Sequence, residues 1–175
     1  GKDGLRAKDG TLFRFQFTYT SGSTFAEQLG TVLKESLGKE GIEVSLRPLE
    51  WATFIKGLDE RAFDAAVLSW SLPVEQDPYQ VWHSSQSKEG SNFVGFENAE
   101  ADRLIEGART EFDRKKRIAL YQRFHRLLHE EQPYTFLFMG ESLVAVDRRF
   151  EGVTVHKLGL DSREWWVPER RQKYR

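Results

Sequence analysis

Apolar and polar residues recur with different periods along the first part of the chain. Residues 11–20 alternate strictly, with an aromatic side chain at every second position from Phe13 to Tyr19, which predicts a strand with one buried face. Residues 42–48 alternate in the same way, and Pro48 ends this second predicted strand because its nitrogen cannot donate to a sheet. Residues 63–70 (FDAAVLSW) are apolar on both sides, which is typical of a strand covered on both faces.

Helical patterns separate these three predicted strands. Residues 24–37 carry one apolar stripe, and Thr24 with Glu27 three positions later has the form of a capping box at the helix start. Residues 50–61 also place their large apolar side chains at helical spacing. The order βαβαβ indicates a largely parallel sheet with right-handed crossovers. Residues 63–70 are the best candidate for its central strand, because central parallel strands are buried on both sides.

The second part of the chain begins with an irregular, polar stretch and continues with two predicted helices. Asn98 precedes the first, over residues 99–109, and Asp113 precedes the second, over residues 114–131. Both are residue types that accept hydrogen bonds from the free N–H groups of a first helical turn. Each helix has an apolar stripe, so we expect the two to pack against a common core.

Two short apolar segments follow these helices. Residues 133–138 (PYTFLF) and 142–146 (SLVAV) flank Gly140, which predicts two antiparallel strands. Residues from Gly152 onward show only a weak pattern. The predicted fold class is therefore α/β, with a mixed sheet that begins as βαβαβ and is followed by helices and an antiparallel strand pair.

Composition excludes several classes of function. The 26 Lys and Arg residues against 27 Asp and Glu residues argue against a nucleic-acid partner, because such binding depends on excess positive charge. The chain contains no cysteine, which removes thiol chemistry and cysteine-bound zinc. Its apolar runs are far shorter than the ~20 residues of a membrane helix, so we expect no direct membrane insertion. It begins without Met or a signal peptide, and we expect it to be a piece of a longer protein.

Residues that could support catalysis or bind metal do not form a recognisable site. His125 and His129 have the i, i+4 spacing of a metal pair, but Arg126 stands where a zinc protease carries its glutamate, so we interpret both as solvated. The adjacent carboxylates at 59–60 and 130–131 point away from each other on a helix and cannot form a dyad. Phosphate loops and nucleophile elbows are missing. We expect no enzyme activity, no cofactor and no metal.

Residues 69–85 (SWSLPVEQDPYQVWHSS) are the best candidate for a binding surface. In open α/β sheets, ligands bind beyond the carboxyl ends of the strands, and Trp70 leaves the third predicted strand at such an end. Trp51, at the start of the preceding helix, could approach the same rim. Alternatively, Trp70 only closes the core. For Asp77, a cap on a short helix after Pro78 is favoured over a ligand contact.

The succession GIEVSLRPLEWATFIKGL, FDAAVLSWS, DPYQVWHSS, NFVGFENAEADRLIEGAR and RIALYQRFHRLLHEEQPYTFLF resembles the C-terminal lobe of the extracellular solute-binding proteins, family 5, from about Phe13 to Phe150. This family includes the oligopeptide and dipeptide receptors of ABC transporters. The resemblance implies a lobe of a periplasmic-binding-protein type II fold, with residues 1–150 as the solute-binding lobe. Residues 151–175 would then pack on a lobe outside this chain.

The same resemblance implies a function. Such receptors are two-lobed, close on a solute by a hinge, and deliver it to a membrane permease; they are periplasmic or are lipoproteins at the cell surface. The most expected solute is a peptide. The alternative is a standalone interaction or regulatory domain that reuses this lobe to bind a protein.

The resemblance also implies site residues. Trp51 and Trp70 match tryptophans that face the cleft in relatives, and Ser69 and Ser71 flank a strand end where backbone groups can pair with an extended ligand. Asp77 is the remaining candidate for a ligand contact.

Two departures from the family pattern concern the ligand. Relatives that hold a peptide amino group place an acidic residue where this sequence has Pro73, and here acids follow only at Glu75 and Asp77. The place at which some relatives carry an arginine is apolar, near Val67. These departures leave the identity of the ligand open.

Overall fold

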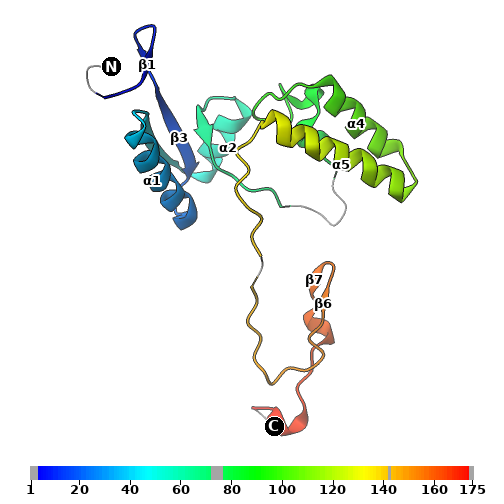
Figure 1. Ribbon diagram of the computed structural model, residues 1–175. Coiled ribbons are helices and arrows are strands. Elements are labelled where there is room, and N and C mark those ends of the chain that lie inside the picture. The colour runs from blue at the N-terminus through cyan, green and yellow to red at the C-terminus, as the bar shows by residue number, and fades with distance from the viewer. Residues whose placement is uncertain (1–3, 72–76, 142, 174–175) are drawn as a thin grey trace. The chain divides into compact units, whose positions relative to one another are not determined.

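The computed structural model describes residues 4–71, 77–141 and 143–173. By its internal contacts the described part of the chain divides into two compact units, residues 4–71 with 77–134, and residues 135–141 with 143–173. The described strands and helices of the first unit are shown in Figure 1: β1 (Ala7–Lys8), β2 (Thr11–Leu12), β3 (Arg14–Thr20), α1 (Thr24–Lys39), β4 (Glu43–Leu49), α2 (Trp51–Asp59), β5 (Ala65–Ala66), α3 (Tyr79–Trp82), the 3₁₀ helix Ser84–Gln86, α4 (Ala99–Thr110) and α5 (Arg114–Glu131).

The described sheet that carries the βαβαβ start has the strand order β4-β3-β5, and both pairings are parallel. Phe17 of β3 is paired with Leu46 of β4 on one side and with Ala65 of β5 on the other. The predicted parallel sheet is therefore confirmed. The prediction that residues 63–70 form its central strand is wrong, because β3 is central and β5 lies at an edge of these three strands.

The short β5 has a local physical cause. Asp64 accepts the Gln16 N–H with its side-chain Oδ2 at 2.9 Å, so a carboxylate takes a donor of β3 that a backbone carbonyl would otherwise bind. After the Val67 N–H bond to the Thr18 carbonyl, at 3.2 Å, the chain continues as irregular structure with Leu68 and Trp70 partly exposed. The apolar residues of 63–70 therefore do not form a strand that is buried on both faces.

Helix α1 covers one face of this sheet. Buried Phe17, Tyr19, Ala26 and Val44 form the shared core, into which the apolar stripe of α1 packs. Gly30 lets the helix approach closely, since a Cβ at this position would lie 3.0 Å from a methyl group of Leu46. The N-terminal cap of α1 lies one residue earlier than predicted.

Ser23, rather than Thr24, caps α1. Its side chain accepts the Ala26 N–H at 3.3 Å, and Thr24 is the first helical residue. The extended backbone of Ser23 is what a capping residue requires, and it follows directly from the turn at Gly22, which has a positive φ of 80°.

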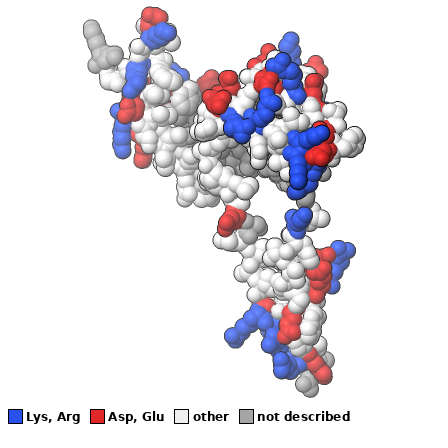
Figure 2. Space-filling model, turned by 45° about the vertical axis from the view of Figure 1, so that its right-hand side comes forward, with Lys and Arg blue, Asp and Glu red and all other residues white. Residues whose placement is uncertain are grey.

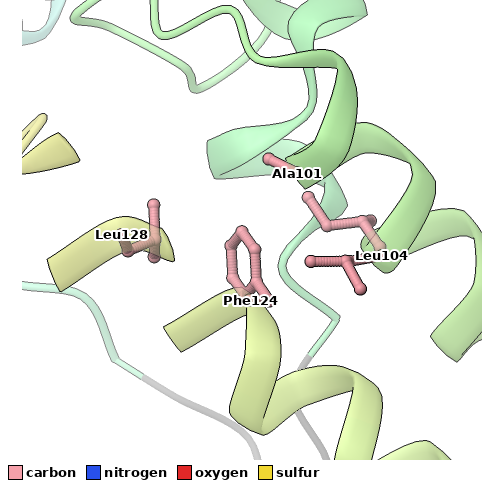
Figure 3. Packing of buried hydrophobic residues seen from close by; sticks show 5 residues of the cluster. Ala101, Leu104, Phe124 and Leu128 are labelled. Atoms are coloured by element: carbon pink, nitrogen blue, oxygen red, sulfur yellow. The ribbon is translucent and has the colours of Figure 1, made fainter. Parts of the chain in front are cut away.

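Helices α4 and α5 pack against each other and form a second core (Figure 3). Asn98 accepts the N–H groups of Glu100 and Ala101, and Asp113 accepts those of Lys115 and Lys116, so both predicted caps are confirmed. Their apolar stripes meet in a cluster of five buried residues: Ala101, Leu104, Ile105, Phe124 and Leu128.

The second unit contains a small hairpin of β6 (Val155–His156) and β7 (Gly159–Leu160) and the 3₁₀ helices Ser162–Glu164 and Glu169–Arg171. Glu151 and Trp166 exchange backbone hydrogen bonds of 2.8 and 3.0 Å. An antiparallel pair thus follows the helices as predicted, but at β6 and β7. The described residues within 133–138 and 142–146 form no strand, so these two positions were wrong; Ser142 lies outside the described residues.

This misplacement follows from pairing rather than from side-chain type. A strand needs a neighbour for its backbone N–H and C=O groups, and an apolar run such as residues 136–139 supplies none by itself. Leu137, Met139 and Leu143 are exposed instead. In the ranges that the structure describes, no helix is long and apolar enough to cross a membrane.

Candidate functional site

Three parallel strands of the first unit end at the same edge of the sheet. Beyond this carboxyl edge, β3 continues into residues 21–23, β4 into Glu50 and Trp51, and β5 into residues 67–71. Because neighbouring strands are about 4.8 Å apart, β4 and β5 lie roughly 10 Å from each other across β3. The loops that carry the predicted site residues therefore leave one sheet edge on either side of its central strand.

Trp51 opens α2 and presents most of its indole to solvent, with an exposed fraction of 60%. Its ring contacts Phe54, with 6.2 Å between centroids. The neighbouring Glu50 caps α2, since its carboxylate accepts the Ala52 N–H at 2.8 Å and the Thr53 N–H at 3.4 Å. Trp51 is thus available for contact, whereas the Glu50 carboxylate already has backbone partners.

Trp70 lies partly buried on the ring of Phe93, with 5.9 Å between centroids and 11° between planes, and 37% of the residue remains exposed. Tyr134 packs on the ring of Trp82, with 4.5 Å between centroids. Burial raises the pKa of Tyr134, and the indole N–H of Trp70 and the charge of Arg61 partly oppose this rise. Trp70 therefore packs against the protein with one part of its side chain and leaves another part accessible to a ligand.

Ser69 and Ser71 are exposed and lie beyond the part of the chain that pairs with β3. Their segment is irregular from residue 67 to residue 71, with no strand assigned there. An exposed backbone that follows the end of a sheet strand is suited to hydrogen bonding with an extended ligand. Their roles as ligand contacts remain predictions.

Asp77 has two structural partners. Its Oδ1 accepts the Tyr79 N–H at 3.0 Å at the start of α3, and its Oδ2 forms an ion pair with Arg109 Nε at 3.1 Å. The Arg109 guanidinium also lies over the Tyr79 ring, 4.3 Å from its centroid. The capping interpretation is confirmed, while a ligand role for Asp77 stays a prediction. Pro73 and Glu75 lie outside the described residues.

A polar network beside this segment was missed by the sequence analysis. His83 is buried and stacks on Tyr79, with 4.2 Å between centroids, while its Nδ1 lies 2.9 Å from Ser85 Oγ. Its Nε2 lies 3.3 Å from Glu106 Oε1 on α4. In the sequence, the only sign of this network was a histidine among aromatic residues, and that pattern did not indicate which side chains His83 would contact. The network ties α3 to α4 and so fixes the loop that follows the site.

Asn92 is a second residue that sequence patterns did not identify. It is completely buried, its amide nitrogen donates to the carbonyls of His83 and Phe96, and its carbonyl accepts the Phe96 N–H at 2.9 Å. This side chain replaces regular backbone pairing in residues 92–96. It therefore holds the loop that carries Phe93 beneath Trp70.

His125 and His129 are exposed on α5. Within the described part of the chain, no group of three or more His, Asp or Glu side chains is arranged to hold a metal ion. Figure 2 shows that basic and acidic side chains are intermingled on the face in view, with neither sign gathered into one large patch.

Comparison with known proteins agrees with this geometry. The sequence profile of the bacterial extracellular solute-binding proteins, family 5 Middle, matches residues 1–92. The chain is 37% identical over 169 residues to the oligopeptide-binding protein AppA of Bacillus subtilis, covering 94% of this chain and 31% of AppA. The structure of AppA in complex with a nonapeptide superposes with a TM-score of 0.80 at 35% identity, over 95% of this chain and 34% of that one.

A further solved structure extends the range of ligands among similar proteins. NikZ from Campylobacter jejuni, in complex with Ni(L-His), matches 76% of this chain and 27% of its own, with 25% identity and a TM-score of 0.67. The chain spans about a third of the length of the relatives that it matches. By the family match over more than half of its residues, the chain belongs to the bacterial extracellular solute-binding proteins, family 5, and has the fold of a lobe of type II periplasmic binding proteins.

Proposed function

We propose that the chain is the ligand-binding lobe of an extracytoplasmic receptor that delivers a solute, in the first place a peptide, to an ABC importer. The observation that carries this proposal is the position of Trp70, which lies beyond the carboxyl edge of a parallel sheet with one part packed on Phe93 and another part exposed. Family membership and the similarity to AppA, which was solved with a nonapeptide, support the ligand class.

The site supplies two kinds of contact. The exposed indoles of Trp51 and Trp70 offer large rigid apolar surfaces, which bind at little cost in side-chain entropy. The irregular backbone around Ser69 and Ser71 offers N–H and C=O groups to an extended ligand. No step of this role requires catalysis, a cofactor or a metal.

One sheet edge covers only one side of a ligand. Sites that bind tightly bury most of the ligand surface, so a second surface must close over it. Hinge closure of a second lobe on this one would supply that surface, and the closed form would then be recognised by the permease. We place the complete receptor in the periplasm or, as a lipoprotein, at the cell surface.

The charges at the described rim favour a ligand held mainly through its backbone and apolar groups. The Glu50 carboxylate binds N–H groups of α2, and the Asp77 carboxylate binds Tyr79 and Arg109. A buried ligand ammonium would need a close carboxylate that is not already engaged. Recognition of a free peptide amino group therefore does not rest on either of these two residues.

Native mass spectrometry of the complete gene product, purified without refolding, tests the proposal. We expect a peptide to co-purify, and Trp70→Ala to weaken its binding by about 1 kcal/mol or more, roughly fivefold, as for loss of a buried aromatic anchor. Phe112→Ala, which changes an exposed aromatic residue next to α4, is the control and should leave affinity unchanged. A folded Trp70→Ala protein with wild-type affinity would remove Trp70 from the site.

A further inference from the structure

Arg61 stands at a backbone position that normally favours glycine. It follows the end of α2 with a positive φ of 56°. The Arg61 N–H donates to the Leu58 carbonyl and the Ala62 N–H to the Gly57 carbonyl, which is the Schellman arrangement at a helix C-terminus. A non-glycine residue is strained in this left-handed conformation, and such strain persists where the side chain has a specific role.

The Arg61 guanidinium joins the end of α2 to a distant loop. Its Nη1 donates to the Leu58 carbonyl at 2.9 Å, and its Nη2 donates to the carbonyls of Ser87 at 3.0 Å and Gly90 at 2.9 Å. Hydrogen bonds from a planar guanidinium fix both its position and its orientation. The loop that leads to Phe93 is thereby held against α2.

The same guanidinium also contacts the aromatic ring that packs on Trp70. Its Cζ lies 5.2 Å from the centroid of the Phe93 ring, and Phe93 in turn lies nearly parallel to the indole of Trp70. Phe93, supported by Arg61, thus restricts one face of the Trp70 indole, while part of Trp70 remains open to solvent.

We propose that Arg61 and Phe93 are positioning residues of the solute site, which hold the Trp70 indole in its binding orientation before ligand arrives. This inference rests on the proposed function. An indole free to occupy several rotamers would be competent in only a fraction of molecules, and the apparent affinity falls by that fraction. Removing the stack should weaken binding about threefold to tenfold, because a large side chain must then be ordered when the ligand binds.

Phe93→Leu is the main test, because it removes the aromatic ring that stacks on Trp70 and leaves the hydrogen bonds of Arg61 in place. Arg61→Gly is the second, because glycine suits the backbone conformation and only the side chain is lost. Both are made in the complete gene product, with tryptic peptides of casein as the probe and bound peptides identified by native mass spectrometry. The peptide retained most by the wild type then serves for calorimetric titration.

Two readouts separate positioning from general stability. In a Trp70→Ala background, Phe93→Leu should cause no further loss of affinity, and equal losses in both backgrounds would overturn the proposal. The near-ultraviolet circular dichroism of Trp70, obtained as the difference from each protein's Trp70→Phe counterpart, should shrink in Phe93→Leu. An unchanged Trp70 signal would also overturn it.

The controls distinguish this inference from the proposed function. Phe112→Leu should retain both affinity and signal. A wild-type protein that is folded but retains no peptide would contradict the proposed peptide receptor, whatever the dichroism shows. A wild type that binds peptide, with Phe93→Leu and Arg61→Gly binding equally well, would contradict only the positioning role.

Discussion

Arg109 on α4 pairs with Asp77 at the start of α3, with 3.1 Å between Nε and Oδ2. Because the other carboxylate oxygen accepts the Tyr79 N–H, Asp77 links the beginning of one helix to the end of another. Asp77 is the first described residue after residues 72–76. Asp77 therefore has a structural explanation that requires no ligand.

Replacing Asp77 distinguishes its capping role from ligand binding. Asp77→Ala removes both contacts and should lower the free energy of unfolding by about 1–2 kcal/mol, whereas Asp77→Asn keeps an acceptor for Tyr79 and should cost less than about 1 kcal/mol. Urea denaturation of each variant measures these differences. Peptide affinity of the complete gene product should stay within about twofold in both. A tenfold loss of affinity in Asp77→Asn with unchanged stability would instead identify a ligand contact.

Two phenylalanines near the α4–α5 pair should respond very differently to truncation. Phe124 is 2% exposed within the core of Figure 3, and Phe124→Ala should destabilise the chain by about 3–5 kcal/mol through lost burial and a cavity. Phe112 is 96% exposed, and Phe112→Ala should change stability by less than about 0.5 kcal/mol. Equal effects in denaturant titrations would contradict the described packing.

Helices and their caps were predictable because their signals are local. The side chains of Asn98 and Asp113 bind N–H groups two and three residues away, so the sequence contains both partners of each contact. Ser23 was missed in favour of Thr24 because both can cap, and only the backbone conformation decides between them. The strands expected at residues 63–70, 133–138 and 142–146 were harder to predict, because the backbone groups with which a strand pairs lie elsewhere in the chain.

Asn92 should be among the least replaceable polar residues of the first unit. It is fully buried with three hydrogen bonds to backbone groups, and Asn92→Ala would leave those groups without a partner. We expect a loss of about 2–4 kcal/mol in the free energy of unfolding. Gln122→Ala, at an exposed position of α5, is the matched control and should lie within about 0.5 kcal/mol of wild type. A similar small change in Asn92→Ala would contradict the assigned role.

The candidate site was only partly visible in the sequence. The positions of Trp51 and Trp70 followed from the rule that ligands bind beyond the carboxyl ends of parallel strands. Phe93 and Arg61 carried no such signal, because one lies in an irregular loop and the other follows a helix. Only the folded arrangement shows that Phe93 contacts both Trp70 and Arg61.

The raised pKa of Tyr134 should make the stability of the folded chain depend on pH in alkaline solution. Burial raises its pKa above the ordinary value of 10.0, so the folded chain favours the neutral phenol more than the unfolded chain does. This contribution to stability is fully present below the unfolded pKa of about 10, and it is lost as pH rises through the folded-state pKa. In Tyr134→Phe, the decline of stability above that pH should therefore be less steep than in the wild type.

Trp70→Phe provides the sharper measurement, because it removes the indole N–H, which lowers the pKa of Tyr134. Without that donor the pKa of Tyr134 should rise further, and the phenolate absorbance missing from Tyr134→Phe should appear at higher pH than in the wild type. Ultraviolet titration of the folded chain, with each protein compared with its own Tyr134→Phe counterpart, isolates this group. Since Trp70 is also the proposed ligand contact, a downward shift or none in Trp70→Phe would contradict the described influence of its indole on Tyr134.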